Sequence, residues 1–109
     1  MYSVSFLPCA RRDLEDIARY IARTLGNPEA ALRTVEGIVA AANRLANMPY
    51  RRPVYVPLRP LTHEYRTTRS GNYVAFYWIE EEPQRVTVAR VLCAKANASA
   101  RLAAAEREL

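Results

Sequence analysis

The sequence has few of the residues from which metal centres and disulfide frameworks are built. Its 109 residues include one histidine, His63, and two cysteines, Cys9 and Cys93, which lie far apart and match no metal-ligand spacing. We therefore expect no metal site and no other cofactor. We expect both cysteines to be reduced and partly buried, as is usual in a cytoplasmic protein.

Long apolar runs are also absent. No stretch approaches the roughly 18–20 apolar residues that a membrane-spanning helix needs. The first residues lack the basic region and apolar run of a secretory signal. Half of the residues are hydrophobic and a quarter are charged, which is typical of a globular protein. We expect residues 1–109 to form a single cytoplasmic domain that does not associate with membranes.

Lysine is scarce and arginine is abundant, since 15 of the 16 basic residues are arginine. Arginine forms forked contacts with carboxylates and phosphates. The positive charge is concentrated in residues 48–79, where five arginines oppose Glu64 alone. These arginines are Arg51, Arg52, Arg59, Arg66 and Arg69. They indicate a surface that meets acidic residues or nucleic acid, or one that is merely solvated.

The spacing of apolar residues predicts an α+β fold. Residues 2–7 alternate like a strand, and residues 9–25 and 28–47 have the periodicity of amphipathic helices. The helices are separated by Gly26-Asn27-Pro28, which predicts a helical hairpin. Four prolines make residues 49–61 an extended connection. Strand patterns return at 63–68, 73–79 and 85–92, and Asn97 or Ser99 could cap a final helix.

Because successive strands are joined by short turns, we predict a twisted antiparallel sheet of three or four strands, in the order β-α-α-β-β-β. The helical hairpin should cover one face of this sheet. Within the aromatic run of residues 73–78, Tyr77 and Trp78 are the best candidates for exposure. The side chains expected to be largely buried are Leu14, Ile17, Ile21, Val35, Ile38, Leu45, Val74 and Phe76.

Three local patterns, in this order along the chain, resemble the RelE/ParE superfamily of toxins from type II toxin–antitoxin systems. The first opens the chain as Tyr2-x-Val4-x-Phe6, followed by Asp13-Leu14-x-x-Ile17. The second is the end of the second helix, Leu45…Met48-Pro49. The third is Glu64-Tyr65-Arg66…Asn72-Tyr73-x-x-Phe76-Tyr77.

This resemblance implies one of two toxic activities, both of which inhibit growth. RelE-like toxins cut mRNA in the ribosomal A site, whereas ParE-like toxins bind DNA gyrase and have no known catalytic site. ParE-like systems are also associated with plasmid stabilization. In both groups a cognate antitoxin wraps along the toxin, and the complex binds its operator DNA through the antitoxin.

The positions that the resemblance assigns to a RelE-like nuclease are mostly changed here. Arg66 matches the first basic residue, but Thr68 and Val74 stand where further basic residues are expected. Residues 94–102 contain no tyrosine or histidine for proton transfer, although Lys95 or Arg101 could supply a cation. These changes and the long helical hairpin favour the ParE-like, non-enzymatic function.

Two alternatives remain. The chain could be a ribosome-dependent mRNA endoribonuclease that uses His63, Arg66, Arg69 and Lys95, or a catalytically inactive family member that acts as a binding partner. In a strand His63 and Tyr65 would share one face, with Glu64 and Arg66 on the other as an ion pair or antitoxin contact. We assign no catalytic residue. As binding residues we predict Arg51, Arg52, Arg59, Arg66, Arg69 and Tyr77.

Overall fold

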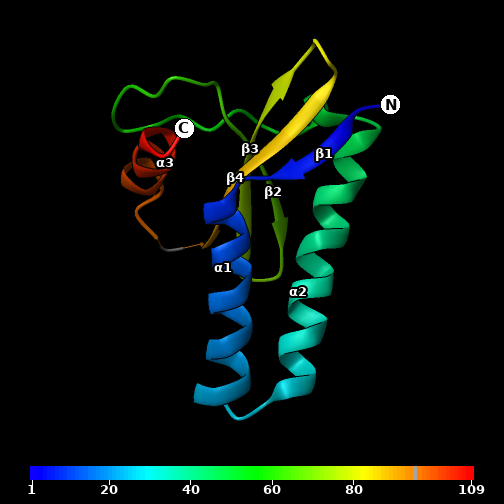
Figure 1. Ribbon diagram of the computed structural model, residues 1–109, viewed down its shortest axis with the longest axis vertical. Helices are drawn as coiled ribbons and strands as arrows, with labels where there is room; N and C mark the ends of the chain where they lie inside the picture. Colours follow the sequence, from blue (N-terminus) through cyan, green and yellow to red (C-terminus); the bar gives the residue numbers. More distant parts are fainter. Residues whose placement is uncertain (95) are drawn as a thin grey trace.

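The computed structural model describes residues 1–94 and 96–109 (Figure 1). These described residues form four strands and three α-helices, with short helical turns between them. In chain order these are β1 (Ser3–Phe6), α1 (Pro8–Arg19), α2 (Pro28–Asn43), β2 (Arg66–Ser70), β3 (Tyr73–Glu80), β4 (Arg85–Cys93) and α3 (Ala98–Arg107). A π-helical turn, Tyr20–Thr24, extends α1, and two 3-10 turns, Arg44–Ala46 and Pro49–Arg51, follow α2.

The four strands form one sheet in the order β1-β4-β3-β2. The pairs β2–β3 and β3–β4 are antiparallel, as predicted from the short turns that join them. The prediction of a purely antiparallel sheet is wrong for β1, which pairs with β4 in parallel. No tight turn joins β1 to β4, because the helical hairpin, β2 and β3 lie between them in the chain. Their relative direction is therefore not set by a local turn.

The helical hairpin is confirmed, and its ends follow the local sequence. Pro8 and Pro28 each begin a helix. Gly26 takes a positive φ of 66° in the turn, and the Asn27 side chain accepts a hydrogen bond from Ala30 N at 3.0 Å. The two helices lie side by side, and their connected ends extend beyond the sheet (Figure 1). Gly37 lets α2 approach the end of β2, because a Cβ there would lie 3.0 Å from Ser70 Oγ.

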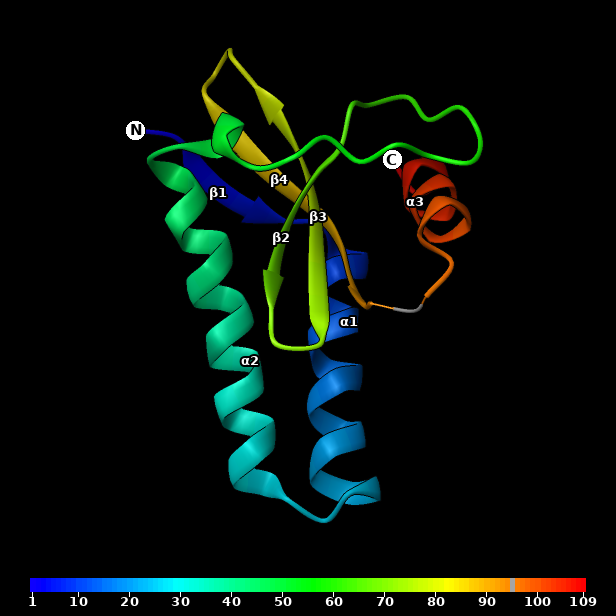
Figure 2. The same ribbon diagram turned by 180° about the vertical axis from the view of Figure 1, so that it is seen from behind.

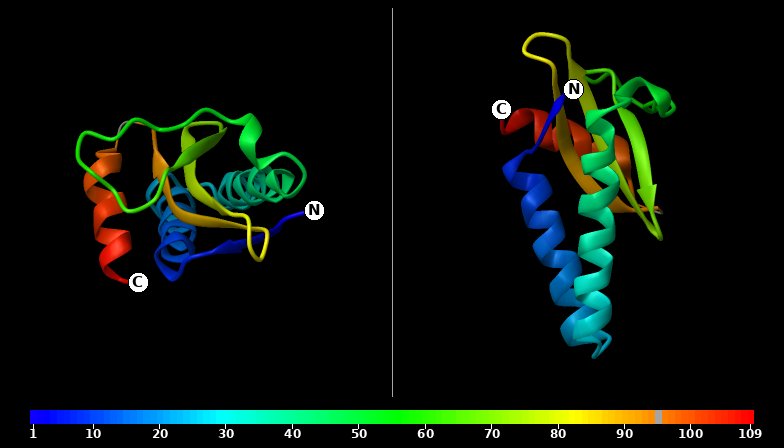
Figure 3. Two further views of the ribbon diagram at one scale, coloured as in Figure 1. Left: turned by 90° about the horizontal axis from the view of Figure 1, so that it is seen from above. Right: turned by 90° about the vertical axis from the view of Figure 1, so that its right-hand side faces the viewer.

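The sheet is covered on both faces (Figure 3). The hairpin packs on one face over Ala75, Tyr77, Val86, Val88 and Val91. On the other face, Leu102 of α3 joins a second apolar cluster, and the segment of residues 53–65 packs beside it. This second face explains the apolar run of β3, since a strand covered on both sides needs apolar residues at every position.

Most of the predicted core is buried, including Ile17, Ile21, Ile38, Leu45 and Phe76. Leu14, Val35 and Val74 are only partly buried. Neither candidate for exposure in the aromatic run is exposed, because Tyr77 is 0% and Trp78 is 7% exposed. Tyr77 lies beneath the hairpin, and Trp78 belongs to the cluster under α3.

The C-terminal helix α3 is present although it has few apolar anchors. Asn97 caps it by accepting a hydrogen bond from Ala100 N at 3.2 Å. Leu102 and Ala105 face the sheet and are almost completely buried. Among the described residues, none of the helices is both long enough and apolar enough to span a membrane.

Candidate functional site

The segment of residues 48–65 contains Arg51, Arg52 and Arg59. It follows the helical turns after α2, passes along the second face of the sheet and leads into β2. The first part of this segment, the 3-10 turn Pro49–Arg51, is held against the sheet, because Tyr77 Oη of β3 donates a hydrogen bond of 2.6 Å to the carbonyl of Pro49. Burial raises the pKa of Tyr77 to about 12, although Arg66 and Arg52 partly oppose this. The Tyr77 phenol therefore remains a neutral donor at physiological pH.

Arg66 also holds this turn. Its Nη1 donates to the carbonyls of Arg52 at 2.7 Å and Tyr50 at 3.2 Å. The guanidinium lies over the Tyr50 ring at 5.3 Å, and its Nη2 is 3.7 Å from Glu64 Oε1. The side chain is only 18% exposed. The guanidinium is thus engaged within the chain, and its contact with Glu64 is the local ion pair expected for these two residues.

The turn is tied to two further parts of the chain through Glu81. Its carboxylate accepts hydrogen bonds from Tyr50 Oη at 2.7 Å and from Tyr2 Oη at 2.6 Å. These bonds stabilise the carboxylate and lower the pKa of Glu81, and they raise the pKa of Tyr2 to about 12. The N-terminus, the β3–β4 turn and the Pro49–Arg51 turn are thereby connected.

The five predicted binding arginines do not form one surface. Arg51 and Arg52 are exposed and line a groove of about 240 Å³ together with Arg44. Arg44 was not among the predicted binding residues, because it precedes the arginine-rich residues 48–79 in the sequence. Arg69 donates from Nε to the carbonyl of Gly71 at 2.9 Å in the β2–β3 turn. This turn lies at the opposite end of β2 from the Pro49–Arg51 turn (Figure 2). Arg59 is exposed in the connection between the Pro49–Arg51 turn and β2.

His63 lies just before β2 and stacks on Trp78, with parallel ring planes and centroids 3.9 Å apart. It lines a hollow of about 150 Å³ with Tyr50, Glu64 and Arg66. The structure therefore brings together His63 and Arg66, two of the four nuclease candidates. Arg69 lies at the other end of β2, and Lys95 lies outside the described residues.

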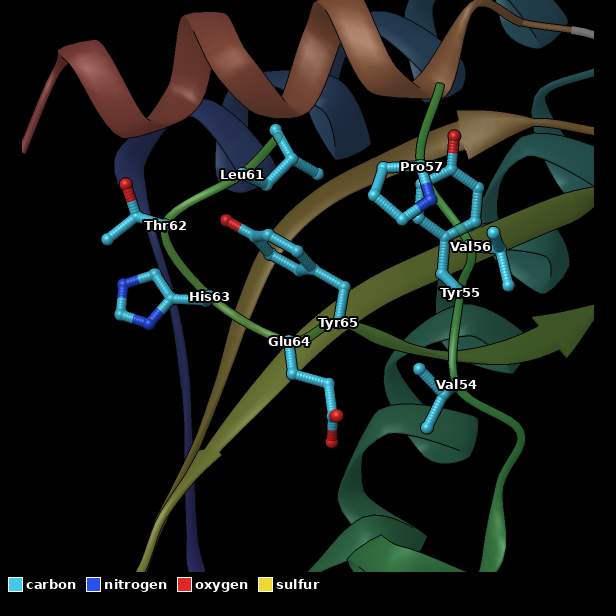
Figure 4. A pocket seen from close by; sticks show the side chains of 9 residues that line it. All are labelled: Val54, Tyr55, Val56, Pro57, Leu61, Thr62, His63, Glu64 and Tyr65. Carbon is cyan, nitrogen blue, oxygen red and sulfur yellow. The ribbon is translucent and has the colours of Figure 1, made fainter. Parts of the chain in front are cut away.

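A second hollow of about 400 Å³ lies within the segment of residues 54–65 (Figure 4). The hydroxyl group of Tyr65 points from it toward α3 (Figure 4) and donates a hydrogen bond of 3.0 Å to Glu106. Burial and this contact raise the pKa of Tyr65. The ring is 1% exposed, in agreement with the expectation that Tyr65 packs in the core.

Two polar residues of α3 hold the wall of this hollow in place, and the sequence predicted this role for neither of them. Ser99 Oγ is 2.7 Å from Tyr55 Oη and accepts from Leu58 N at 2.9 Å. Glu106 accepts from the backbone N–H groups of residues 62 and 63. Burial pushes the pKa of Glu106 up, but these hydrogen bonds and the one from Tyr65 outweigh it, so the net shift is downward.

A buried ion pair joins α1 to β4. Asp13 accepts two hydrogen bonds of 2.7 Å from Arg90 and one of 2.9 Å from Val91 N. An extra residue in β4 opposite Phe76 and Tyr77 places Val91, and not Arg90, in the core beneath the hairpin. Arg90 Nη1 also donates to the carbonyl of Arg101 in α3 at 3.4 Å.

A hollow of about 490 Å³ lies beside this pair, between α1, the start of β3, the end of β4 and α3. Its apolar lining includes Ile17, Tyr20, Tyr73 and Leu92, and its polar lining includes Asp16 and Arg101. Cys93 also lines it and is exposed, whereas Cys9 is buried with its Sγ 3.1 Å from the carbonyl of Ala89. Burial raises the pKa of the Cys9 thiol.

No group of three histidine, cysteine, aspartate or glutamate side chains lies close enough to hold a metal ion within residues 1–94 and 96–109. The positions at which the resemblance predicts nuclease side chains include those of Thr68, Val74 and Arg101. Thr68 is buried at 4% exposure, Val74 is partly buried, and Arg101 is exposed.

Known proteins resemble this chain in sequence and in fold. Residues 4–98 match the family model described as the ParE toxin of the type II toxin–antitoxin system parDE. The RelBE2 toxin–antitoxin complex of Mycobacterium tuberculosis contains a chain that is 29% identical, with a TM-score of 0.60, over 84% of this chain and 96% of that one. No curated protein sequence is similar enough to match.

Two further solved structures share the fold. The chromosomal ParDE system of P. aeruginosa gives a TM-score of 0.66 at 20% identity, over 85% of this chain and 96% of that one. A mutant of the E. coli toxin RelE in its free state gives 0.55 at 22% identity, over 99% and 98%. Because the family model covers most of the sequence, the chain belongs to the ParE toxin family, within the RelE/ParE superfamily, and is a toxin of a type II toxin–antitoxin system.

Proposed function

From this family membership, we propose that the toxin arrests growth by binding an essential target, DNA gyrase, and not by cleaving RNA. The observation that carries this proposal is the engagement of Arg66. A cation that stabilises a phosphoryl transition state must present free N–H groups to the phosphate oxygens. Arg66 Nη1 already donates to two backbone carbonyls, and the guanidinium also contacts Glu64.

We further propose that a cognate antitoxin silences the toxin by covering its surface. The M. tuberculosis and P. aeruginosa relatives were solved as toxin–antitoxin systems, which supports a partner of the same kind here. The hollow between α1 and α3 has the apolar lining and charged rim that a partner helix requires. Of the predicted binding residues, Arg51, Arg52, Arg59 and Arg69 remain proposed contacts. Tyr77 is buried, and the Arg66 guanidinium contacts the Pro49–Arg51 turn and Glu64.

The operator-binding and cellular parts of this proposal follow from the family. The antitoxin would carry the complex to its operator DNA, and both proteins would act in the cytoplasm. These expectations concern the antitoxin gene more than this chain. An adjacent short reading frame, with a DNA-binding N-terminal part and an amphipathic C-terminal part, is the expected genetic context.

One observation favours the alternative, a ribosome-dependent mRNA endoribonuclease. His63, Glu64, Arg66 and Tyr50 line the same small hollow, so an imidazole and a guanidinium lie near each other on the surface. The imidazole could transfer a proton if Arg66 were released from the carbonyls that it now holds. A third candidate, an inactive member that acts only as a binding partner, would bind antitoxin and inhibit neither target.

Two assays on the purified toxin separate these functions. We expect the toxin to inhibit DNA supercoiling by gyrase and to leave ribosome-programmed mRNA intact. We also expect His63→Ala and Tyr65→Phe to retain growth arrest in cells, because an interface rarely depends on one such group. Replacing a true proton-transfer residue would instead reduce the rate of mRNA cleavage about a hundred- to ten-thousand-fold. Ribosome-dependent mRNA ends that disappear in His63→Ala would overturn the gyrase proposal.

A further inference from the structure

The groove at the end of α2 gathers three arginines that have no acidic partner among the described residues. It is lined by Ala41, Arg44, Leu45, Asn47, Met48, Arg51 and Arg52 and encloses about 240 Å³. The three arginines are exposed. Among the described residues, none of their guanidinium groups forms a salt bridge. They are therefore available to a ligand with negative charge.

The backbone under Arg51 and Arg52 is held in place by three hydrogen bonds. Tyr77 Oη donates to the carbonyl of Pro49 at 2.6 Å, and Arg66 Nη1 donates to the carbonyls of Tyr50 and Arg52 at 3.2 and 2.7 Å. Both donors are fixed, since Tyr77 is fully buried and Arg66 is 18% exposed. A fixed backbone reduces the entropy that is lost when a ligand binds.

The surroundings of the groove favour a peptide over a nucleic acid. The Tyr50 ring is adjacent in sequence, but Arg66 covers one of its faces and Glu81 holds its hydroxyl, so it is poorly placed to stack on a base. The walls contributed by Leu45 and the exposed Met48 suit an aliphatic side chain.

We propose that this groove binds an acidic segment of a partner protein, whose carboxylates pair with Arg44, Arg51 and Arg52 while an aliphatic side chain packs on Met48. The inference rests on the proposed function only in giving the toxin a protein partner. It is independent of whether gyrase is the target. It also assigns a role to Arg66, whose guanidinium positions the turn that presents Arg51 and Arg52.

A direct test measures binding of a fluorescein-labelled peptide of alternating glutamate and leucine residues to the full chain, by fluorescence anisotropy at low salt. In the groove variant, Arg44→Gln/Arg51→Gln/Arg52→Gln, the Kd should rise about ten- to a hundredfold, because each of the three exposed charge contacts contributes a factor of about two to five. The matched control, Arg11→Gln/Arg23→Gln/Arg33→Gln, removes the same charge from exposed positions of the helical hairpin. Its Kd should change less than about twofold.

An oligothymidylate with the same net charge as the peptide is the competing probe. The inference is overturned if the oligothymidylate binds more tightly than the peptide and loses that binding in the groove variant. It is also overturned if the two triple variants weaken peptide binding equally, or if the peptide does not bind. Thermal unfolding of both variants checks the fold. Should the groove variant fail to fold, Arg51→Gln and Arg52→Gln singly should each raise the Kd about two- to fivefold.

The peptide-binding result for the groove can be distinguished from the result of the gyrase and mRNA assays. Peptide binding requires neither gyrase nor ribosomes, so a toxin that cleaves mRNA would refute the gyrase proposal while the groove result stood. Conversely, a toxin that inhibits supercoiling but does not bind the peptide would leave the gyrase proposal in place and refute the groove.

Discussion

Replacing Asp13 with alanine removes the acid that holds Arg90 between α1, β4 and α3. The two side chains are 11% and 13% exposed, and they form two hydrogen bonds of 2.7 Å. Removing one partner of a buried pair leaves the other charge uncompensated and costs about 3–5 kcal/mol. Because Arg90 keeps some contact with water, we expect the lower end, about 3 kcal/mol. The loss of the acceptor for Val91 N contributes to this cost.

Urea unfolding of the full chain measures this loss as a lower transition midpoint. The matched control is Asp16→Ala, since Asp16 pairs with Arg19 on the same helix but its side chain is 71% exposed. The control should cost about 0.5 kcal/mol or less. In Asp13→Ala/Arg90→Met the uncompensated charge is also removed, so this double variant should be more stable than Asp13→Ala alone. Equal losses in Asp13→Ala and Asp16→Ala would refute the reasoning.

Two more predictions concern the two faces of the sheet. Ile38→Ala should lower the free energy of unfolding by about 2–5 kcal/mol, because Ile38 is 2% exposed under the hairpin. Leu32→Ala, at an exposed position of the same helix, should change it little, and similar midpoints for the two variants would contradict the packing described. Glu106→Gln should make the free energy of unfolding less dependent on pH in the acidic range. The pKa of Glu106 is lowered on folding, so its carboxylate contributes stability that is present above about pH 4.3, the ordinary glutamate value, and is lost as the pH falls through the lowered pKa. Urea midpoints measured across that range should fall less steeply in the variant than in the unaltered chain, and parallel curves would argue against the role of Glu106.

The parts of the fold that local sequence determines were predictable. The hairpin follows from apolar periodicity together with Gly26, Asn27 and Pro28, and the antiparallel strand pairs follow from their short turns. The pairing of β1 with β4 depends on where the chain returns after most of the domain is built, and apolar alternation is the same for parallel and antiparallel edge strands. Trp78, a candidate for exposure, is buried because the segment before β2 folds over it, with the His63 ring stacked on its indole at 3.9 Å, and no local sequence pattern indicates that contact.

The candidate site was less predictable, because its main contacts are made to the backbone. Arg66 was identified as a candidate cation, but its acceptors are the carbonyls of Tyr50 and Arg52, which carry no side-chain signature. Asp13 and Arg90 are separated by 77 residues in sequence, so no local pattern marks them as a pair. Ser99 and Glu106 were unremarkable in sequence for the same reason, since most of what they hold is backbone N–H.

The position of Arg66 bears on how one fold can serve either chemistry or binding. A guanidinium at the start of β2 can bind a phosphate only if the turn after α2 leaves its N–H groups free. Here that turn approaches closely enough for its carbonyls to accept them. The same two hydrogen bonds fix the backbone that presents Arg51 and Arg52 to solvent. An arginine at position 66 can therefore serve as a cation for a phosphate or as a support for a binding surface. Its identity alone does not distinguish these two roles, whereas its hydrogen-bond partners bear on the distinction.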